Sequence, residues 1–231
     1  MADYLIIVAG GKGLRMGSDV PKQFMLLGGK PVLMRTIERF LEALPSLHIV
    51  LVLPEVHVDY WRNLCEQYDF RVPLTIALGG KERFHSVKNG LAQIDALCSC
   101  TEHSSRVCAV HDAVRPLVSV EVIRRAFREA AQCGAVVPAL PAVDSVRVKD
   151  GEGHFVAVDR RDVMLVQTPQ VFQYSVLAEA YAQPYRDVFT DDASVVESLG
   201  HPIRLIEGNR ENIKITTPLD ILLAQLYLSE K

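Results

Sequence analysis

The stretch Tyr4-Leu5-Ile6-Ile7-Val8-Ala9-Gly10-Gly11-Lys12-Gly13-Leu14-Arg15-Met16-Gly17 lies near the start of the chain and decides the fold. Its first six residues are apolar without alternation, which is typical of a strand buried on both faces of a sheet. The glycines that follow predict a tight loop with exposed backbone N–H groups, and Lys12 and Arg15 add two cations to it. A loop of this kind after a strand predicts a phosphate-binding site.

The glycine spacing excludes the two commonest phosphate-binding motifs. A dinucleotide fingerprint G-x-G-x-x-G that starts at Gly11 needs glycine where Met16 stands, which argues against a nicotinamide dehydrogenase. A P-loop needs Gly-Lys and then Ser or Thr where Arg15, Met16 and Gly17 lie. A tight turn that binds no ligand stays open as the alternative, although two cations in the loop favour phosphate binding.

Apolar runs and amphipathic stretches alternate after this loop. Such short apolar strands, separated by helices of about 10 to 15 residues, favour an α/β fold with a mainly parallel, Rossmann-like sheet and helices on both faces. Ligands of such sheets lie at the carboxyl ends of the strands. Strands are expected at 49–53, 74–78 and 107–110, and helices between Pro31 and Pro45 and at 58–68, 86–97 and 122–133.

The pattern changes after an expected strand at 135–139. Residues 143–149 and 155–158, joined by the turn at 150–153, predict a β-hairpin with polar flanks. We interpret residues 143 to about 159 as an arm inserted into the sheet, and residues 1–231 as a single domain without an internal repeat or linker. Later elements are expected at 175–182 and 193–199 (helices), 203–206 and 212–215 (strands), and from Pro218 onward (a last helix).

The composition limits the partners of this chain. Its 231 residues include 25 Lys and Arg against 28 Asp and Glu, a net charge of −3, so nucleic acid is not an expected partner. No apolar run approaches the ~18 residues of a membrane span, and the acidic start of the sequence does not resemble a signal peptide. Five cysteines without framework spacing fit a reducing compartment. We therefore expect a cytoplasmic protein.

Further charged residues follow the expected strands. Lys22 comes shortly after the glycine loop, Asp112 and Arg115 follow the fourth expected strand, and Lys214 stands on an expected strand ahead of the last helix. A carboxylate beside a phosphate site predicts Mg²⁺. Two alternatives stay open, namely that Lys22 is a solvated surface lysine and that Asp112 is the N-cap of a short turn. We interpret His111 as a satisfied, half-buried strand residue, because an ionised phosphate nucleophile needs no base.

Taken together, these motifs resemble the 2-C-methyl-D-erythritol 4-phosphate cytidylyltransferases, within the wider nucleotidyltransferases of nucleotide-sugar type. The resemblance covers nearly the whole chain, and its motifs occur in one consistent order. They are residues 10–16, Pro21-Lys22-Gln23, Gly79-Gly80, Ser86-Val87, residues 111–116, Val158-Asp159-Arg160, residues 167–170, residues 190–194, Gly208-Asn209 and residues 212–216.

The resemblance implies a transfer of CMP from CTP to a methylerythritol phosphate, with release of pyrophosphate, with Mg²⁺ and without an organic cofactor. Arg15, Lys22 and Lys214 would face the triphosphate and the charge of the transition state, and Asp112 would help to hold Mg²⁺. Positioning and charge neutralisation are what this reaction requires, since the attacking phosphate is already ionised.

The same resemblance implies the remaining site residues. The nucleotide would be bound by Gly10, Gly11, Gly13, Gly80 and Ser86, and the polyol phosphate by Arg115, Ser145, Arg160 and Thr190. Taken alone, Arg160 is typical of a surface arginine and Thr190 of a helix N-cap. The chain departs from the family pattern at Lys81, where some members carry an acid, and at Ser145, where relatives carry Thr.

The arm is too short to be stable as an isolated hairpin, so we expect a second copy of the chain to cover it with two-fold symmetry. The resemblance likewise implies a homodimer in which the arms interlock and Thr190 of one subunit reaches the acceptor site of the other. Two other functions stay open: a cytidylyltransferase for ribitol 5-phosphate or another polyol phosphate, and a non-catalytic nucleotide-binding module. The cations at Lys22 and Lys214 argue against the module.

Overall fold

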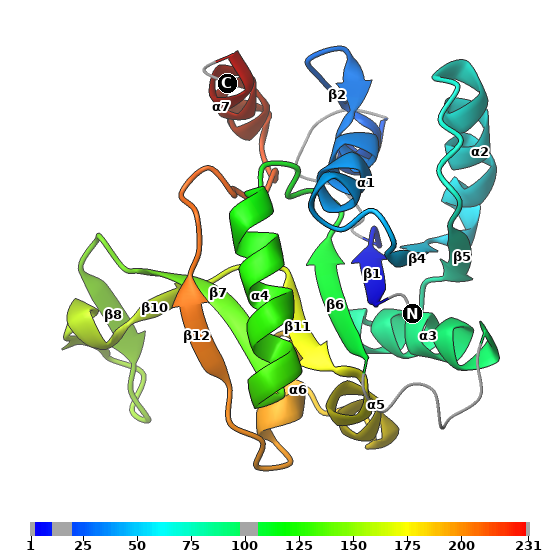
Figure 1. Cartoon of the computed structure of the whole chain (residues 1–231). Helices are drawn as coiled ribbons and strands as arrows, with labels where there is room; N and C mark the ends of the chain where they lie inside the picture. The colour runs from blue at the N-terminus through cyan, green and yellow to red at the C-terminus, as the bar shows by residue number, and fades with distance from the viewer. Residues whose placement is uncertain (1–2, 11–19, 98–105, 230–231) are drawn as a thin grey trace.

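The structure is a computed structural model, which describes residues 3–10, 20–97 and 106–229 (Figure 1). Within these ranges, an eight-stranded sheet forms the centre of the fold. Its strands are β1 (Tyr4–Val8), β4 (His48–Leu53), β5 (Thr75–Leu78), β6 (Val107–Asp112), β7 (Ala135–Pro141), β10 (Met164–Val166), β11 (Gln170–Gln173) and β12 (Arg204–Glu207). They follow the order β10-β7-β11-β6-β1-β4-β5, and β12 pairs with β7.

The centre of this sheet is parallel. β1 pairs in parallel with both β4 and β6, and β4 pairs in parallel with β5. In this register Val8 lies opposite Asp112, so that β6 ends beside the point where the glycine loop leaves β1. The predicted fold class is therefore confirmed, and the carboxyl ends of β1 and β6 meet at one edge.

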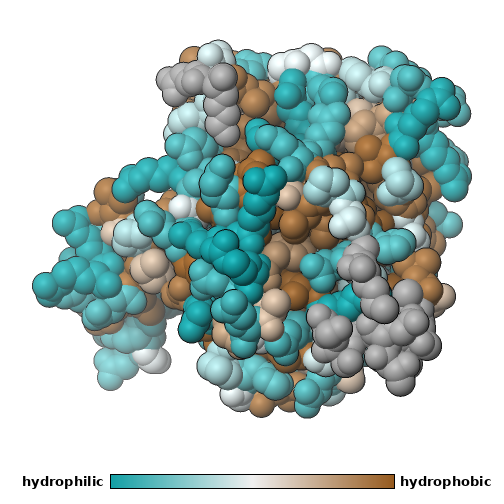
Figure 2. Space-filling model, in the orientation of Figure 1, coloured by the Kyte–Doolittle hydropathy of each residue, from teal (hydrophilic) through white to brown (hydrophobic). Residues whose placement is uncertain are grey.

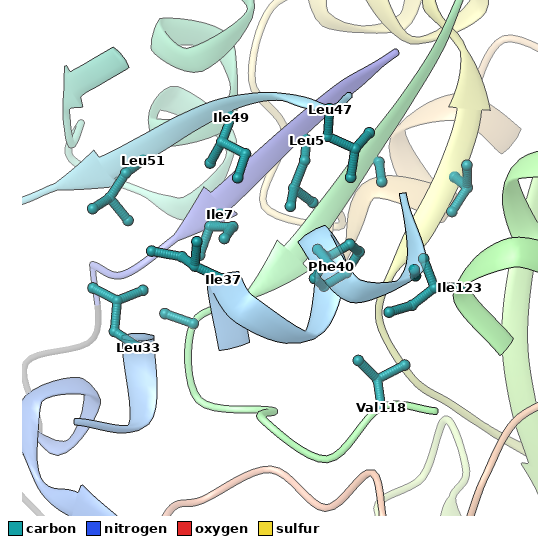
Figure 3. Packing of buried hydrophobic residues seen from close by; sticks show 14 of the residues in the cluster. Leu5, Ile7, Leu33, Ile37, Phe40, Leu47, Ile49, Leu51, Val118 and Ile123 are labelled. Carbon is teal, nitrogen blue, oxygen red and sulfur yellow. The ribbon is translucent and has the colours of Figure 1, made fainter. Parts of the chain in front are cut away.

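Helices cover both faces of the sheet (Figure 1). They are α1 (Val32–Ala43), α2 (Val58–Gln67), α3 (Arg83–Leu97), α4 (Val120–Cys133), α5 (Tyr174–Ala182), α6 (Asp192–Glu197) and α7 (Pro218–Ser229). Because side chains alternate along a strand, Leu5 and Ile7 pack with α1, α2 and α4, whereas Tyr4 and Ile6 pack with α3, α5 and α6. Figure 3 shows the first of these clusters, with Ile37 and Phe40 of α1 facing the strand residues.

The sequence analysis missed two strands. β10 and β11 run antiparallel to their neighbours: β10 pairs with β7, and β11 pairs with both β7 and β6. They contain only three and four residues and are separated by Pro169, which is typical of a strand break. The sheet is consequently mixed, with a parallel centre and antiparallel strands toward the arm.

The expected strand at 212–215 is absent from the described fold, and these residues form an irregular segment. The Asn212 side chain donates to the Gln167 side chain and to the carbonyl of Thr168, and the Ile215 N–H donates to the carbonyl of Val114. Ile215 itself is buried in a small apolar cluster under α7. The alternation of apolar and polar residues here reflects side-chain packing, and Lys214 stands on this segment and not on a strand.

The predicted hairpin is present. β8 (Val146–Lys149) pairs with β9 (Phe155–Val158) in a two-stranded sheet of its own, apart from the main sheet. Its turn is stabilised by Asp150, whose side chain accepts from the N–H groups of Glu152 and His154, and by Gly153 at φ +93°. In Figure 1 this hairpin projects beside β10, on the side of the molecule away from β1 and β5.

Three further short elements precede α1. The 3-10 helix η2 (Lys22–Phe24) leads into the two-stranded β2 (Leu26–Leu27) and β3 (Lys30–Pro31). The side chain of Gln23 is buried and donates to the carbonyl of Ala9 at 3.1 Å, which ties η2 to the end of β1. Across the described residues, no helix has the length and apolar character that a membrane crossing requires.

Candidate active site

A cavity of about 300 Å³ lies at the carboxyl ends of β1 and β6. Its walls come from the end of β1, from η2, from the loop between β5 and α3, and from the segments after β6 and before α7. The lining residues are Val8, Ala9, Gly10, Lys22, Gln23, Gly80, Lys81, Glu82, Arg83, Ser86, Asp112, Ala113, Val114 and Lys214. The cavity therefore lies at the strand ends, where parallel sheets bind ligands.

Gly10, Gly80 and Ser86 meet at one side of this cavity. The Gly80 N–H donates to Oγ of Ser86 at 3.1 Å. A side chain on Gly80 would collide with Cβ and with the backbone of His85, so the turn into α3 can close only around glycine. A Cβ on Gly10 would lie 3.9 Å from the same Ser86 Oγ. Three of the predicted nucleotide-binding residues thus share one wall.

Asp112 is a buried residue of the same cavity and faces three cations. Its carboxylate lies 2.8 Å from Nζ of Lys214, 3.6 Å from Nε of Arg115 and 3.9 Å from Nε of Arg83. Burial alone would raise the pKa of Asp112, but these three cations together hold it well below its usual value. Asp112 is therefore an ionised carboxylate at neutral pH.

The sequence left open that Asp112 caps a turn; in the structure only its backbone carbonyl, and not its side chain, takes part in the turn. The Asp112 carbonyl accepts from the N–H of Arg115 at 3.1 Å and so closes the turn after β6. The carboxylate itself is engaged by the surrounding cations. The side chain thus belongs to the cavity.

Lys22 and Lys214 both line the cavity, as the sequence analysis expected. Lys22 is brought there by η2, which Gln23 anchors to β1. The predicted residues Gly11, Gly13 and Arg15 lie outside the described residues, so their roles stay predictions.

Arg83 is the residue that sequence reasoning missed. It is the first residue of α3, and it lines the cavity. Its Nη1 and Nη2 bind the two carboxylate oxygens of Asp192 at 2.8 and 2.7 Å, although 109 positions separate the two residues. The only sequence signal was its place directly after Gly79-Gly80-Lys81-Glu82, and no spacing rule connects that place with Asp192.

Thr190 is exposed and precedes α6. The N-cap of α6 is Asp191, whose side chain accepts from the N–H of Ser194 at 2.9 Å, so the interpretation of Thr190 as the cap is wrong. Two residues after Thr190, Asp192 binds Arg83 at the cavity of the same chain. This geometry favours a place for Thr190 at its own subunit's site over the expected place at the partner's.

The other predicted acceptor residues do not line the cavity. Arg115 pairs with Asp112 and donates from Nη1 to the carbonyl of Asn212 at 2.6 Å. Ser145 is exposed on the arm, and Arg160 donates from Nη1 to the carbonyl of Val143 at 2.7 Å. Within one chain, the structure therefore separates Ser145 and Arg160 from the cavity that Asp112 and Lys214 share.

His111 is fully buried at the end of β6, beside Asp112. Its Nε2 lies 3.1 Å from the carbonyl of Arg115, its ring contacts Phe40 edge to face, and its Nδ1 has no hydrogen-bond partner among the described residues. Burial lowers its pKa to about 4. His111 is thus more buried and less satisfied than expected, and it is neutral at pH 7.

The donor set fits Mg²⁺ only together with a substrate. Among the described residues, no group of three or more His, Cys, Asp or Glu could hold a metal. Asp112 offers one carboxylate, and Mg²⁺ in nucleotide sites is usually bound by one or two carboxylates and by substrate phosphates. This single carboxylate at the cavity is compatible with a metal that phosphate oxygens also bind.

Comparisons with known proteins find relatives that match nearly the whole chain. The family model described as 2-C-methyl-D-erythritol 4-phosphate cytidylyltransferase matches residues 4–230. A protein with that name from Phocaeicola vulgatus is 52% identical over 228 residues, which cover 99% of this chain and 100% of that protein. One from Bacteroides fragilis is also 52% identical, with the same coverage.

A solved structure is similar as well. The crystal structure of 4-diphosphocytidyl-2C-methyl-D-erythritol synthase from Anaerococcus prevotii is 26% identical, with a TM-score of 0.79 over 99% of this chain and 96% of that one. The match of fold and of sequence extends over the cavity and the arm alike. On this basis, the chain belongs to the 2-C-methyl-D-erythritol 4-phosphate cytidylyltransferase family.

Proposed function

We propose that this chain transfers a cytidylyl group from CTP to 2-C-methyl-D-erythritol 4-phosphate at the cavity between β1, β6 and α3. The products are pyrophosphate and 4-diphosphocytidyl-2-C-methyl-D-erythritol, in the non-mevalonate isoprenoid pathway. Family membership over residues 4–230 supports the reaction. The observation that carries the chemistry is the ionised Asp112 with Lys214 at 2.8 Å, in a cavity that Lys22 also lines.

An oxygen of the acceptor phosphate attacks the α-phosphorus of CTP, and the bond from that phosphorus to the bridging oxygen breaks. The electron pair leaves with pyrophosphate. No proton has to be removed from the nucleophile, so catalysis depends on alignment and on positive charge near the phosphates. Lys22 and Lys214, which both line the cavity, are proposed to supply that charge. Arg15 is proposed to add to it.

The wall formed by Gly10, Gly80 and Ser86 is proposed to bind the nucleoside. Gly80 has no side chain that would keep a base away from the backbone, and the Ser86 hydroxyl is fixed by the Gly80 N–H and by the carbonyl of Glu82. Gly11 and Gly13 follow Gly10 in the sequence, and they are proposed to bind the nucleotide as well. Polar groups held in this way can select one base through its hydrogen-bonding edge.

Asp112 is proposed to hold Mg²⁺ together with the triphosphate. A bound divalent cation would act as a Lewis acid and neutralise phosphate charge. Lys214, Arg83 and Arg115 keep Asp112 ionised and fix its position. The carboxylate is thereby ready to bind a cation when the nucleotide arrives.

A homodimer is proposed to complete the acceptor site. The arm and the neighbouring strand β10 expose apolar side chains, and Figure 2 shows hydrophobic residues among hydrophilic ones on the projecting part at the left. These side chains are Val148, Phe155, Val156, Met164, Leu165 and Val166. A two-fold related copy would cover them and could bring Ser145 and Arg160 of one arm to the cavity of the other subunit.

A cytoplasmic location of the protein also stays a prediction.

The test is to incubate the protein with CTP and Mg²⁺, together with either 2-C-methyl-D-erythritol 4-phosphate or ribitol 5-phosphate, and to follow pyrophosphate release. We expect release with the methylerythritol phosphate, and a ³¹P spectrum of the product that shows a new diphosphate linkage. Release with ribitol 5-phosphate alone would favour the other cytidylyltransferase. Binding of CTP without release from either acceptor would favour the nucleotide-binding module.

A further inference from the structure

Arg83 connects two parts of the site that are distant in sequence. It begins α3, directly after the loop that carries Gly80, and it lines the cavity. Its two Nη atoms bind both carboxylate oxygens of Asp192, at the start of α6. Its Nε lies 3.9 Å from Asp112, at the end of β6. One guanidinium group therefore faces two carboxylates from two different elements.

The Asp192 end of this connection is rigidly held. Asp192 is fully buried, so its charge requires partners, and a bidentate arginine is the partner that matches a carboxylate best. The hydroxyl of Tyr181 on α5 donates a second bond to Oδ1 of Asp192 at 2.6 Å. Arg83 can thus neither rotate nor shift without leaving a buried carboxylate partly unpaired.

The neighbouring residue of the same segment has an anchor of its own. Gln170, the buried first residue of β11, donates from Nε2 to Asp191 at 2.7 Å and accepts at Oε1 from the N–H of Ala193 at 2.8 Å. Gln170 pairs with Val110 of β6, two residues before Asp112. The segment with Thr190 is therefore fixed to β6 through Gln170 and to the cavity through Arg83.

We infer that Arg83 is a positioning residue, which sets the place of the Thr190–Asp192 segment relative to Asp112 and so aligns the acceptor with the nucleotide. This inference rests on the proposed function and on the predicted contact of Thr190 with the acceptor. Both Nη atoms of Arg83 are engaged by Asp192, while the nucleoside wall of Gly80 and Ser86 has its own hydrogen bond. Loss of the pair should therefore affect the acceptor far more than CTP.

The first test is Arg83→Lys, which keeps the positive charge but cannot bind both carboxylate oxygens in the planar geometry of arginine. We expect KM for the acceptor to rise about tenfold and kcat to fall, because a small misplacement of one reactant strongly reduces the rate. Because Arg83→Lys keeps a positive charge near Asp112, the dissociation constant of CTP, measured by calorimetry without acceptor, should change less than about twofold. A wild-type KM for the acceptor in Arg83→Lys would show that only the charge of Arg83 matters, and it would overturn the inference.

The second test asks whether Arg83 acts through Asp192. Arg83→Gln, Asp192→Asn and the double variant form a cycle, and a shared role predicts that the double variant is no more impaired in kcat/KM for the acceptor than Arg83→Gln alone. Tyr181→Phe keeps the ring and removes one bond to Asp192, so it should change KM for the acceptor in the same direction by a smaller factor. Additive effects in the cycle would overturn the inference.

A matched control is the exposed pair of Arg62 and Asp59 on α2, which has a nitrogen–oxygen distance of 3.0 Å. Arg62→Lys should leave both kinetic constants unchanged. Thermal unfolding shows which variants still fold. If Asp192→Asn does not fold, the acceptor KM values of Arg83→Lys and Tyr181→Phe still test the inference. If Arg83→Lys is less stable but has an unchanged KM for the acceptor, Arg83 contributes to folding only and the inference is wrong.

These outcomes are distinct from failure of the proposed function. A wild-type chain that releases no pyrophosphate from CTP and methylerythritol phosphate would overturn that function, and with it the acceptor role of Arg83. An active wild type with an unaltered acceptor KM in Arg83→Lys would overturn only the inference about Arg83.

Discussion

Nζ of Lys214 lies 2.8 Å from Oδ2 of Asp112, and the two residues approach from the irregular segment before α7 and from the end of β6. The carboxylate is buried, whereas the lysine is exposed on its other side. Lys214 therefore pairs with Asp112 and is accessible from the cavity at the same time. This pairing explains why an acidic residue tolerates burial beside an anion-binding site.

Lys22→Ala should lower kcat more than it raises KM for CTP. The lysine lines the cavity where charge increases on the phosphates in the transition state, and loss of such a group removes about 3 kcal/mol, roughly a hundredfold in rate. Steady-state kinetics with CTP as the varied substrate provide the measurement. Lys30→Ala is the control, because Lys30 pairs with Glu38 outside the cavity and should leave both constants unchanged. A raised KM with an unchanged kcat would show that Lys22 contributes ground-state binding only.

Asp112→Asn should shift the magnesium dependence to higher concentration and lower the maximal rate. An amide is a weaker Mg²⁺ ligand than a carboxylate, and it leaves Lys214 and Arg83 without their shared counter-charge. Rates measured across a magnesium titration test this expectation, with the exposed Asp59→Asn as the control. If the variant saturates at the same metal concentration and rate as wild type, the assignment of Asp112 is wrong.

His111 should make stability depend on pH between about 4 and 6.5. Its folded pKa is lowered to about 4 by burial, so unfolding takes up a proton in this range, and the stabilisation that is present above pH 6.5 is lost as the pH falls toward 4. From pH 7 to pH 5 the free energy of unfolding should fall by about 2 kcal/mol from this residue alone. Urea unfolding of wild type and His111→Gln at both pH values measures the difference.

The exposed His154→Gln is the control for that comparison, because it removes an imidazole from the protein surface and not from the core. An equal fall of stability in His111→Gln and in wild type would assign the acid sensitivity to other groups.

Phe155→Asp should weaken the dimer. Phe155 is 64% exposed on the arm, and a carboxylate there would place an unpaired charge in an apolar interface. Light scattering over a concentration series should show a dimer for wild type and a shift toward monomer for the variant. Val56→Asp is the matched control, because Val56 is 82% exposed away from the arm. A wild-type chain that is monomeric at micromolar concentration would contradict the dimer.

Mixed dimers should reveal which subunit supplies each acceptor residue. An inactive Lys22→Ala chain mixed with an Arg160→Ala chain should regain activity, up to about a quarter of the sites after random exchange, if Arg160 acts at the partner's cavity. The same Lys22→Ala chain mixed with Thr190→Ala should stay inactive, because Asp192 ties the Thr190 segment to its own chain. If the mixture with Thr190→Ala regains activity, Thr190 acts at the partner's site, as the sequence analysis expected.

Much of the fold could be predicted from local pattern. The apolar run at Tyr4–Val8, the amphipathic segment that became Val32–Ala43 and the hairpin turn at 150–153 each carry their signal within a few residues. The antiparallel strands at Met164–Val166 and Gln170–Gln173 carry almost no local sequence signal. Strands this short form because they pair with neighbouring strands of the sheet. The segment 212–215 had the pattern of a strand but packs as an irregular chain.

By itself, the sequence determined the class of fold and the residue types of the site, since periodicity and charge are local properties of the chain. Only the tertiary structure decided that Arg83 binds Asp192 across 109 positions, that Lys214 reaches Asp112 from an irregular segment, and that Asp192 ties the Thr190 segment to the cavity of its own chain. The physical reason is that buried charges select partners by distance and geometry in space. Residues far apart along the chain satisfy those conditions only once the sheet and its helices have assembled.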